Sequence, residues 1–163
     1  MVVTLLGAAG AGKTTIGQAL AARHGWRLID GDDYHTPQAV EKMRRGIPLT
    51  DAERGPWLAS LHAVIAAAIA RREPLVVACS ALKQRYRDIL RDNLRTVRFV
   101  YLRADEALLR KRLAGRKGHY AGLSLLASQL EALEEPVDAH TLTVDASTPP
   151  DAIVRAIDDA FGL

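Results

Sequence analysis

A run of small residues near the N-terminus carries the strongest chemical signal in this chain. The pattern G-x-x-x-x-G-K-[ST] is matched by Gly7, Ala8, Ala9, Gly10, Ala11, Gly12, Lys13 and Thr14. Small residues let the backbone wrap closely around phosphate oxygens, and its N–H groups then point at the anion. In that geometry the Lys13 ammonium reaches the β- and γ-phosphates, and the Thr14 hydroxyl ligates Mg²⁺.

The residues on either side of this loop favour the same interpretation. An apolar run at Val2–Leu6 has the length and β-propensity of a buried strand, and the pattern after Lys13 is helical. The alternative is an Ala/Gly-rich strand-to-helix turn with an incidental lysine. Because the full spacing lies between a strand and a helix, the sequence predicts a site for a nucleoside triphosphate.

A group of carboxylates follows the second apolar run, in Asp30-Gly31-Asp32-Asp33. Ligands of parallel α/β sheets collect at the carboxyl ends of the strands, so these acids should share a crevice with the phosphate loop. Asp30 and Asp32 are two apart and should point to one face. One could hold Mg²⁺ through water while the other accepts or orients a hydroxyl proton. The alternative is an acidic turn in which Asp33 caps a helix.

Basic residues follow the third apolar run. Lys83, Tyr86 and Arg87 have the i, i+3, i+4 spacing of one helix face. Such a cluster could hold a carboxylate or polarise hydroxyl groups, but a solvated basic helix would have the same spacing.

A second basic segment leads into the glycine-rich stretch Gly115–Leu123, which we expect to form a mobile loop. Arg112 and Arg116 are four apart, and phosphoryl transfer needs cations near the developing charge. A charged helix face explains these two arginines equally well, and His119 by itself is typical of a surface histidine.

Short apolar runs alternate with helical patterns along the whole chain, which predicts an α/β fold with a mainly parallel sheet. The expected strands are Val2–Leu6, Arg27–Asp30, Leu75–Cys79, Val97–Leu102 and Leu142–Val144. The expected helices are Lys13–Arg23, Pro37–Arg45, Asp51–Arg72, Lys83–Arg91, Ala104–Gly115, Ser124–Glu134 and Pro150–Phe161.

Composition limits the classes of protein to which the chain can belong. With 163 residues, 48% hydrophobic and 25% charged, it fits one soluble domain spanning 1–163. No apolar stretch approaches the ~20 residues that span a bilayer, and the net charge of +3 is spread out, so we expect neither a membrane nor a nucleic-acid partner. A single cysteine and an N-terminus that enters the first strand directly favour the cytoplasm.

Six segments of the chain together resemble the small P-loop gluconate kinases, a family related to shikimate and adenylate kinases. They read G-A-A-G-A-G-K-T, D-G-D-D-Y-H, E-K-M-R-R-G-I-P-L-T-D-A-E-R-G-P-W-L, C-S-A-L-K-Q-R-Y-R-D-I-L-R, R-K-G-H-Y and S-Q-L-E-A-L-E-E-P. Many NTPases share the first segment, and the second is suggestive of kinases for small acids. The later blocks, in this order and spacing, are highly specific for gluconate kinases.

The resemblance implies ATP-dependent phosphorylation of D-gluconate at its 6-hydroxyl, with Mg²⁺ as a cofactor and a homodimer as the assembly. It also implies a three-layer α/β/α P-loop kinase fold with a five-stranded parallel sheet in the order 2-3-1-4-5. A helical substrate-binding region would occupy residues of about 35–72, and a mobile lid residues of about 115–135.

On the nucleotide side, the resemblance places Arg112 over the adenine and Arg116 over the phosphates. Thr15 would join the phosphate loop in binding ATP, and Asp30 would support Mg²⁺ with Thr14.

On the acceptor side, the resemblance places Asp32 at the gluconate hydroxyl, near the γ-phosphate, where Lys13 and Arg116 would complete the catalytic group. Four side chains would line the sugar-acid pocket, namely His35, Arg54, Lys83 and Arg87. His119 would reach inward from the lid.

Three positions depart from the family pattern. Ala39 stands where an asparagine is common, which removes one possible hydrogen bond in the acceptor pocket. Tyr120-Ala121-Gly122-Leu123 replaces Phe-Met-Pro-Pro, and the loss of two prolines should make the lid tip more flexible. Glu53 replaces aspartate, a milder change. These departures concern substrate affinity more than the type of reaction.

Two other functions remain open from the sequence. The nearest is a kinase for shikimate or a nucleoside monophosphate, against which the C-S-A-L-K and G-H-Y blocks argue. The other is a regulator that senses a sugar acid without turning it over. The presence of Lys13, Thr14, Asp32 and Arg116 argues against the regulator.

Overall fold

The computed structural model describes residues 1–116 and 122–163 and contains a five-stranded parallel sheet. The strands are β1 (Val2–Leu6), β2 (Arg27–Asp30), β3 (Leu75–Ala78), β4 (Val97–Arg103) and β5 (Thr141–Asp145). Their order across the sheet is β2-β3-β1-β4-β5, and every pairing is parallel. The predicted fold class and strand order are therefore confirmed.

The helices lie close to where the sequence predicts them. They are α1 (Lys13–His24), the 3₁₀ turn η1 (Gly31–Tyr34), α2 (Pro37–Arg44), α3 (Asp51–Ala70), α4 (Gln84–Arg91), α5 (Glu106–Ala114), α6 (Gly122–Ala132) and α7 (Pro150–Phe161). Two helices begin later than predicted. Lys83 has extended dihedrals and serves as the N-cap of α4. Asp105 caps α5, because its carboxylate accepts a hydrogen bond from Leu108 N–H.

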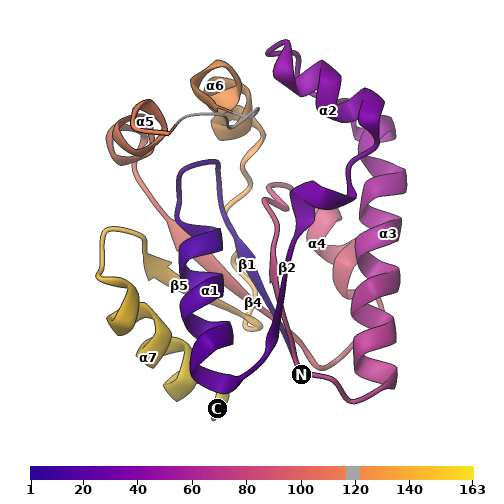
Figure 1. The fold of residues 1–163 in the computed structure, drawn as a ribbon, viewed down its shortest axis with the longest axis vertical. Coiled ribbons are helices and arrows are strands. Elements are labelled where there is room, and N and C mark those ends of the chain that lie inside the picture. Colours follow the sequence, from indigo (N-terminus) through magenta and orange to yellow (C-terminus); the bar gives the residue numbers. More distant parts are fainter. Residues whose placement is uncertain (117–121) are drawn as a thin grey trace.

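Helices cover the two faces of the sheet, as Figure 1 shows, and give the molecule three layers. Helices α1 and α7 pack on one face through a core that includes Leu20, Val100 and Ile157. Helices α3 and α4 pack on the other face, around Leu61 and Phe99. Burial of these apolar faces is what holds the layers together. Within the described residues, none of the helices has the length and hydropathy of a membrane span.

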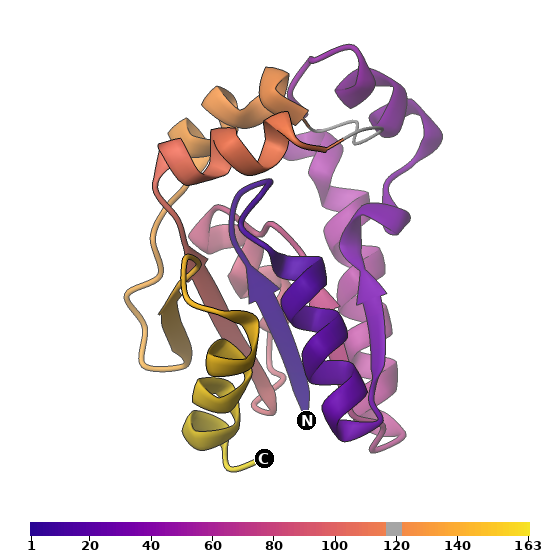
Figure 2. The same cartoon turned by 60° about the vertical axis from the view of Figure 1, so that its left-hand side comes forward.

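Three helices lie beyond the carboxyl end of the sheet (Figure 2). Helices α5 and α6 stand over β1 and the loop that follows it, and α2 lies across from them. Helices α2 and α6 are joined by a small apolar cluster in which Leu125 of α6 packs with Ala39 and Met43 of α2. The space between these helices and the strand ends is where parallel α/β folds place their ligands.

Candidate active site

The phosphate loop connects β1 to α1, as the sequence predicts. Gly12, the N-cap of α1, has φ 100°, a left-handed conformation that side-chain-bearing residues rarely adopt. The Lys13 ammonium folds back over the loop and donates to Gly7 O at 2.8 Å and to Ala8 O at 3.0 Å. Burial lowers the pKa of Lys13, and the carboxylate of Asp32 opposes that shift. The loop thus holds a desolvated cation at the N-terminus of a helix.

The acidic turn lies beside this loop. Asp30 ends β2, and one of its carboxylate oxygens accepts from the Thr14 hydroxyl at 3.2 Å. The other oxygen accepts from the backbone N–H of Asp32 at 3.0 Å. A Cβ on Gly31 would lie 2.9 Å from Ala78 O, so glycine is what lets the turn pack against β3. The structure therefore brings together Thr14 and Asp30, the two residues predicted to support Mg²⁺.

His35 is fixed beneath Asp32 by an aromatic partner. Its ring stacks on Trp57 with the centroids 4.3 Å apart, and its Nε2 lies 3.9 Å from Asp32 Oδ1. Burial, reinforced by the guanidinium of Arg54, lowers the pKa of His35 to about 4. His35 Nδ1 is buried and has no hydrogen-bond partner among the described residues. A neutral imidazole with an unused polar atom is well suited to bind a hydroxyl-rich molecule.

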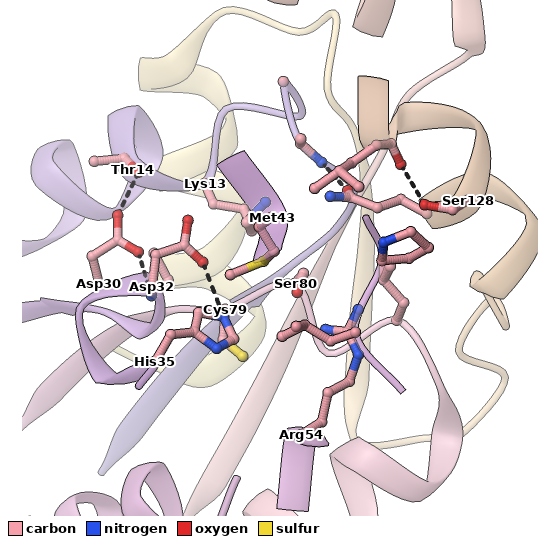
Figure 3. A pocket seen from close by; sticks show the side chains of 18 of the residues that line it. Lys13, Thr14, Asp30, Asp32, His35, Met43, Arg54, Cys79, Ser80 and Ser128 are labelled. Atoms are coloured by element: carbon pink, nitrogen blue, oxygen red, sulfur yellow. Dashed lines mark hydrogen bonds and ion pairs between the residues drawn. The ribbon is translucent and has the colours of Figure 1, made fainter. Parts of the chain in front are cut away.

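One cavity joins these groups, and Figure 3 shows how they converge. Lys13 and Asp32 lie close to each other near the phosphate loop, with His35 below Asp32 and Arg54 further along the cavity. Ser80, two residues after β3, and Ser128, from α6, also line this cavity. A triphosphate end and a small polar acceptor could therefore meet within one space.

A second cavity lies on the other side of the phosphate loop. It is lined by Thr15, Arg112, Arg116, Thr148 and Ile153 among others. The Arg112 guanidinium donates to Ala11 O at 3.1 Å and to Ala146 O at 2.7 Å, which anchors it as one wall. Arg116 lines both cavities. This arrangement leaves room for a base and ribose beside the phosphate loop.

The Lys83 ammonium is already paired in this structure. It donates to Asp51 at 3.0 Å, and the same carboxylate accepts from Arg85 and from the Tyr86 hydroxyl. The Tyr86 and Lys83 hydrogen bonds lower the pKa of Asp51, and burial together with Asp51 raises that of Tyr86 to about 12. Lys83 lines a neighbouring cavity that shares Arg54 with the main one. It therefore lies near the main cavity without lining it.

Arg87 lies away from both cavities, whereas the resemblance implied a place in the sugar-acid pocket. Its side chain is 1% exposed and donates to Ala81 O and Leu82 O at 3.0 Å each and to Glu134 O at 2.9 Å. Arg87 thus connects α4 to the segment that follows β3 and to the segment that follows α6. The remaining predicted residue, His119, lies outside the described residues.

The sequence interpretation missed two polar lining residues on α6, Ser128 and Gln129. Gln129 Oε1 accepts a hydrogen bond from the backbone N–H of Ala9 at 2.8 Å. The signal was present in the S-Q-L-E-A-L-E-E-P block. A helical pattern by itself does not reveal that these polar side chains face the phosphate loop.

The fold and the phosphate loop define the chain as a small P-loop kinase, and residues 2–136 match a family model described as an AAA domain. The chain is 40% identical to a gluconokinase of Gluconobacter oxydans over 156 residues, covering 95% of this chain and 88% of that protein. It belongs to the gluconokinase family.

Solved structures agree with this assignment. The crystal structure of a gluconokinase from Sinorhizobium meliloti 1021 has a TM-score of 0.84 and 42% identity, covering 99% of this chain and 91% of that one. An unliganded sugar kinase from Janibacter sp. HTCC2649 has a TM-score of 0.92 and 35% identity, covering 99% and 94%.

Proposed function

We propose that this protein transfers the γ-phosphoryl group of ATP to the 6-hydroxyl of D-gluconate, giving 6-phosphogluconate and ADP. The observation that carries the proposal is the shared cavity, in which a phosphate-loop lysine faces Asp32 while Arg54 and His35 line the acceptor side. The family relatives named gluconokinase support the choice of acceptor.

Each residue of the cavity has a separate role in the phosphoryl transfer. Asp32 orients the 6-hydroxyl and takes its proton as the hydroxyl oxygen bonds to the γ-phosphorus. The bond from that phosphorus to the β–γ bridging oxygen breaks, and ADP leaves. Lys13 and Arg116 stabilise the negative charge on the transferring group. Arg54 pairs with the gluconate carboxylate, and the neutral ring of His35 binds a hydroxyl of the sugar acid.

Magnesium fits the residues present on the nucleotide side. The Thr14 hydroxyl and the Asp30 carboxylate lie within hydrogen-bond distance of each other and offer the oxygen ligands that Mg²⁺ prefers. When bound, the ion would neutralise charge on the ATP phosphates. Thr14 and Asp30 would hold it, directly or through water.

The resemblance extends the proposal beyond the site. Residues 35–72 would form the acceptor-binding region of a single kinase domain, the chain would assemble as a homodimer, and it would act in the cytoplasm. Light scattering of the purified protein tests the dimer. A monomeric mass would contradict the proposed dimer and leave the proposed activity unaffected.

A coupled assay that follows ADP formation tests the activity. We expect turnover with gluconate and little with gulonate, shikimate or AMP, and we expect Lys13→Ala to abolish it. Preferred turnover of shikimate or AMP would reassign the acceptor. Gluconate binding without ADP formation would instead favour a sugar-acid sensor.

A further inference from the structure

A hydrogen bond joins the phosphate loop to a helix 120 positions further along the chain. The backbone N–H of Ala9 donates to Oε1 of Gln129, in α6, at 2.8 Å. Ala9 lies in the loop immediately before Gly10 and lines the main cavity, as Gln129 does. The contact therefore bridges the nucleotide side of the cavity and the wall formed by α6.

This bond fixes which way the Gln129 amide points. A backbone N–H can only donate, so the amide must turn its oxygen toward Ala9 and its NH₂ group away from it. Among residues 1–116 and 122–163, no group accepts a hydrogen bond from Gln129 Nε2. Gln129 lines both the main cavity and the neighbouring cavity beside Lys83. A donor of fixed orientation is thus presented where the acceptor would bind.

The backbone that carries Gln129 is held from two sides. Leu125, one turn earlier in α6, is buried against Ala39, Met43 and Leu49 on the acceptor side. At the other end, Glu134 N–H donates to Leu82 O at 2.9 Å. Because both ends of the segment are anchored, the position of the Gln129 side chain is built into the fold rather than left to a free surface helix.

We propose that Gln129 is a further substrate-binding residue, whose Nε2 donates to an oxygen of the polyol acid while its Oε1 stays on Ala9 N–H. The inference rests on the proposed function and deepens it. One amide would connect the acceptor directly to the loop that holds the triphosphate, so that a correctly seated acceptor is placed relative to the γ-phosphate. A simple alcohol, which has a single hydroxyl group and no carboxylate, could not accept a hydrogen bond from Gln129 Nε2 and pair with Arg54 at the same time.

The test is Gln129→Met, which keeps the side-chain length but removes both polar groups. We expect the KM for gluconate to rise about tenfold, the effect of losing one hydrogen bond to the substrate, and the KM for ATP to stay within about twofold. If Gln129 only supported the phosphate loop, its replacement would raise the KM for ATP and leave the KM for gluconate nearly unchanged. An unchanged KM for gluconate, or an equal or larger rise in the KM for ATP, would overturn the inference.

The matched control is Gln18→Met, at an exposed position of α1. Wild type and this control must both turn over gluconate; if neither does, it is the proposed function that fails, not the role of Gln129. Should Gln129→Met not fold, Gln129→Glu retains an oxygen for Ala9 N–H and loses the donor. It should raise the KM for gluconate at least as much, and a KM within about twofold of wild type would refute the role.

Discussion

Lys13 and Asp32 are the two single residues on which the proposed chemistry depends most. They come from different elements, the start of α1 and the turn after β2, and meet across one cavity. The pKa of Lys13 is lowered by burial, and the charge of Asp32 partly restores it, so the fold keeps a buried cation close to a carboxylate.

Asp32→Asn should lower kcat far more than it weakens ATP binding. The amide preserves the shape of the side chain but cannot take the hydroxyl proton, a role that contributes roughly 10²- to 10⁴-fold in rate. Steady-state kinetics with both substrates would measure the two effects. An equal loss in kcat and in ATP affinity would reassign Asp32 to the nucleotide.

His35 should remain neutral throughout the physiological range. Its folded pKa is lowered to about 4 by burial and by Arg54, while the unfolded residue titrates near 6.5. As pH falls from about 6.5 to 4, His35 takes up a proton in the unfolded chain but stays neutral in the folded chain. The free energy of unfolding therefore decreases over that pH window. NMR titration of its ring protons measures this pKa directly.

Arg54→Gln provides the matched variant for this titration. Removing the guanidinium should move the pKa of His35 upward, because only burial then opposes protonation. A wild-type His35 that titrates near 6.5 would contradict the buried, stacked environment seen beside Trp57.

At the scale of elements, the connection from β3 to α4 depends on Arg87. This buried cation satisfies carbonyl groups of Ala81, Leu82 and Glu134, and so fastens the end of a strand to the segment after α6. Leu82 itself lines the main cavity. A side chain outside the site therefore shapes its wall.

Arg87→Met should lower the free energy of unfolding by about 3 kcal/mol, because several buried carbonyls lose their donor. Urea denaturation measures the change. Arg85→Met is the control on the same helix, where the arginine side chain is 60% exposed, and it should have a much smaller effect. Unchanged stability together with a raised KM for gluconate would contradict this structural role and indicate that Arg87 contacts the acceptor.

At the scale of the whole molecule, the main cavity and the second cavity meet at the phosphate loop and at Arg116. Each is built from segments far apart in the chain, and both open at the carboxyl end of the sheet. A nucleoside triphosphate that spans them would contact α1, α5 and the start of α7 at once. Binding should therefore stabilise the entire fold rather than one loop.

ATP with Mg²⁺, at about 100 times its Kd, should add about 2.7 kcal/mol of stability. For a chain of this size that raises Tm by about 5–10 °C. Differential scanning fluorimetry measures the shift, and Lys13→Ala should remove most of it. A full shift in that variant would mean that the triphosphate binds elsewhere.

Much of this architecture can be derived from local patterns. The phosphate loop is contiguous, and its glycines and Lys13 have roles that depend on neighbouring backbone alone, so their interpretation needs no distant contact. The strand runs are equally local, and all five predicted strands are present within a residue or so at each end. Helix starts were less accurate, because caps such as Asp105 depend on side-chain geometry.

The assignment of polar side chains required the packed molecule. Lys83, Tyr86 and Arg87 have the spacing of one face, yet the first two bind Asp51 while Arg87 is buried against carbonyl groups. Gln129 meets Ala9 only because α6 folds back over the strand ends. Motif and periodicity depend on neighbours in the chain, whereas the partner of a charged or amide group depends on which distant segments burial brings beside it.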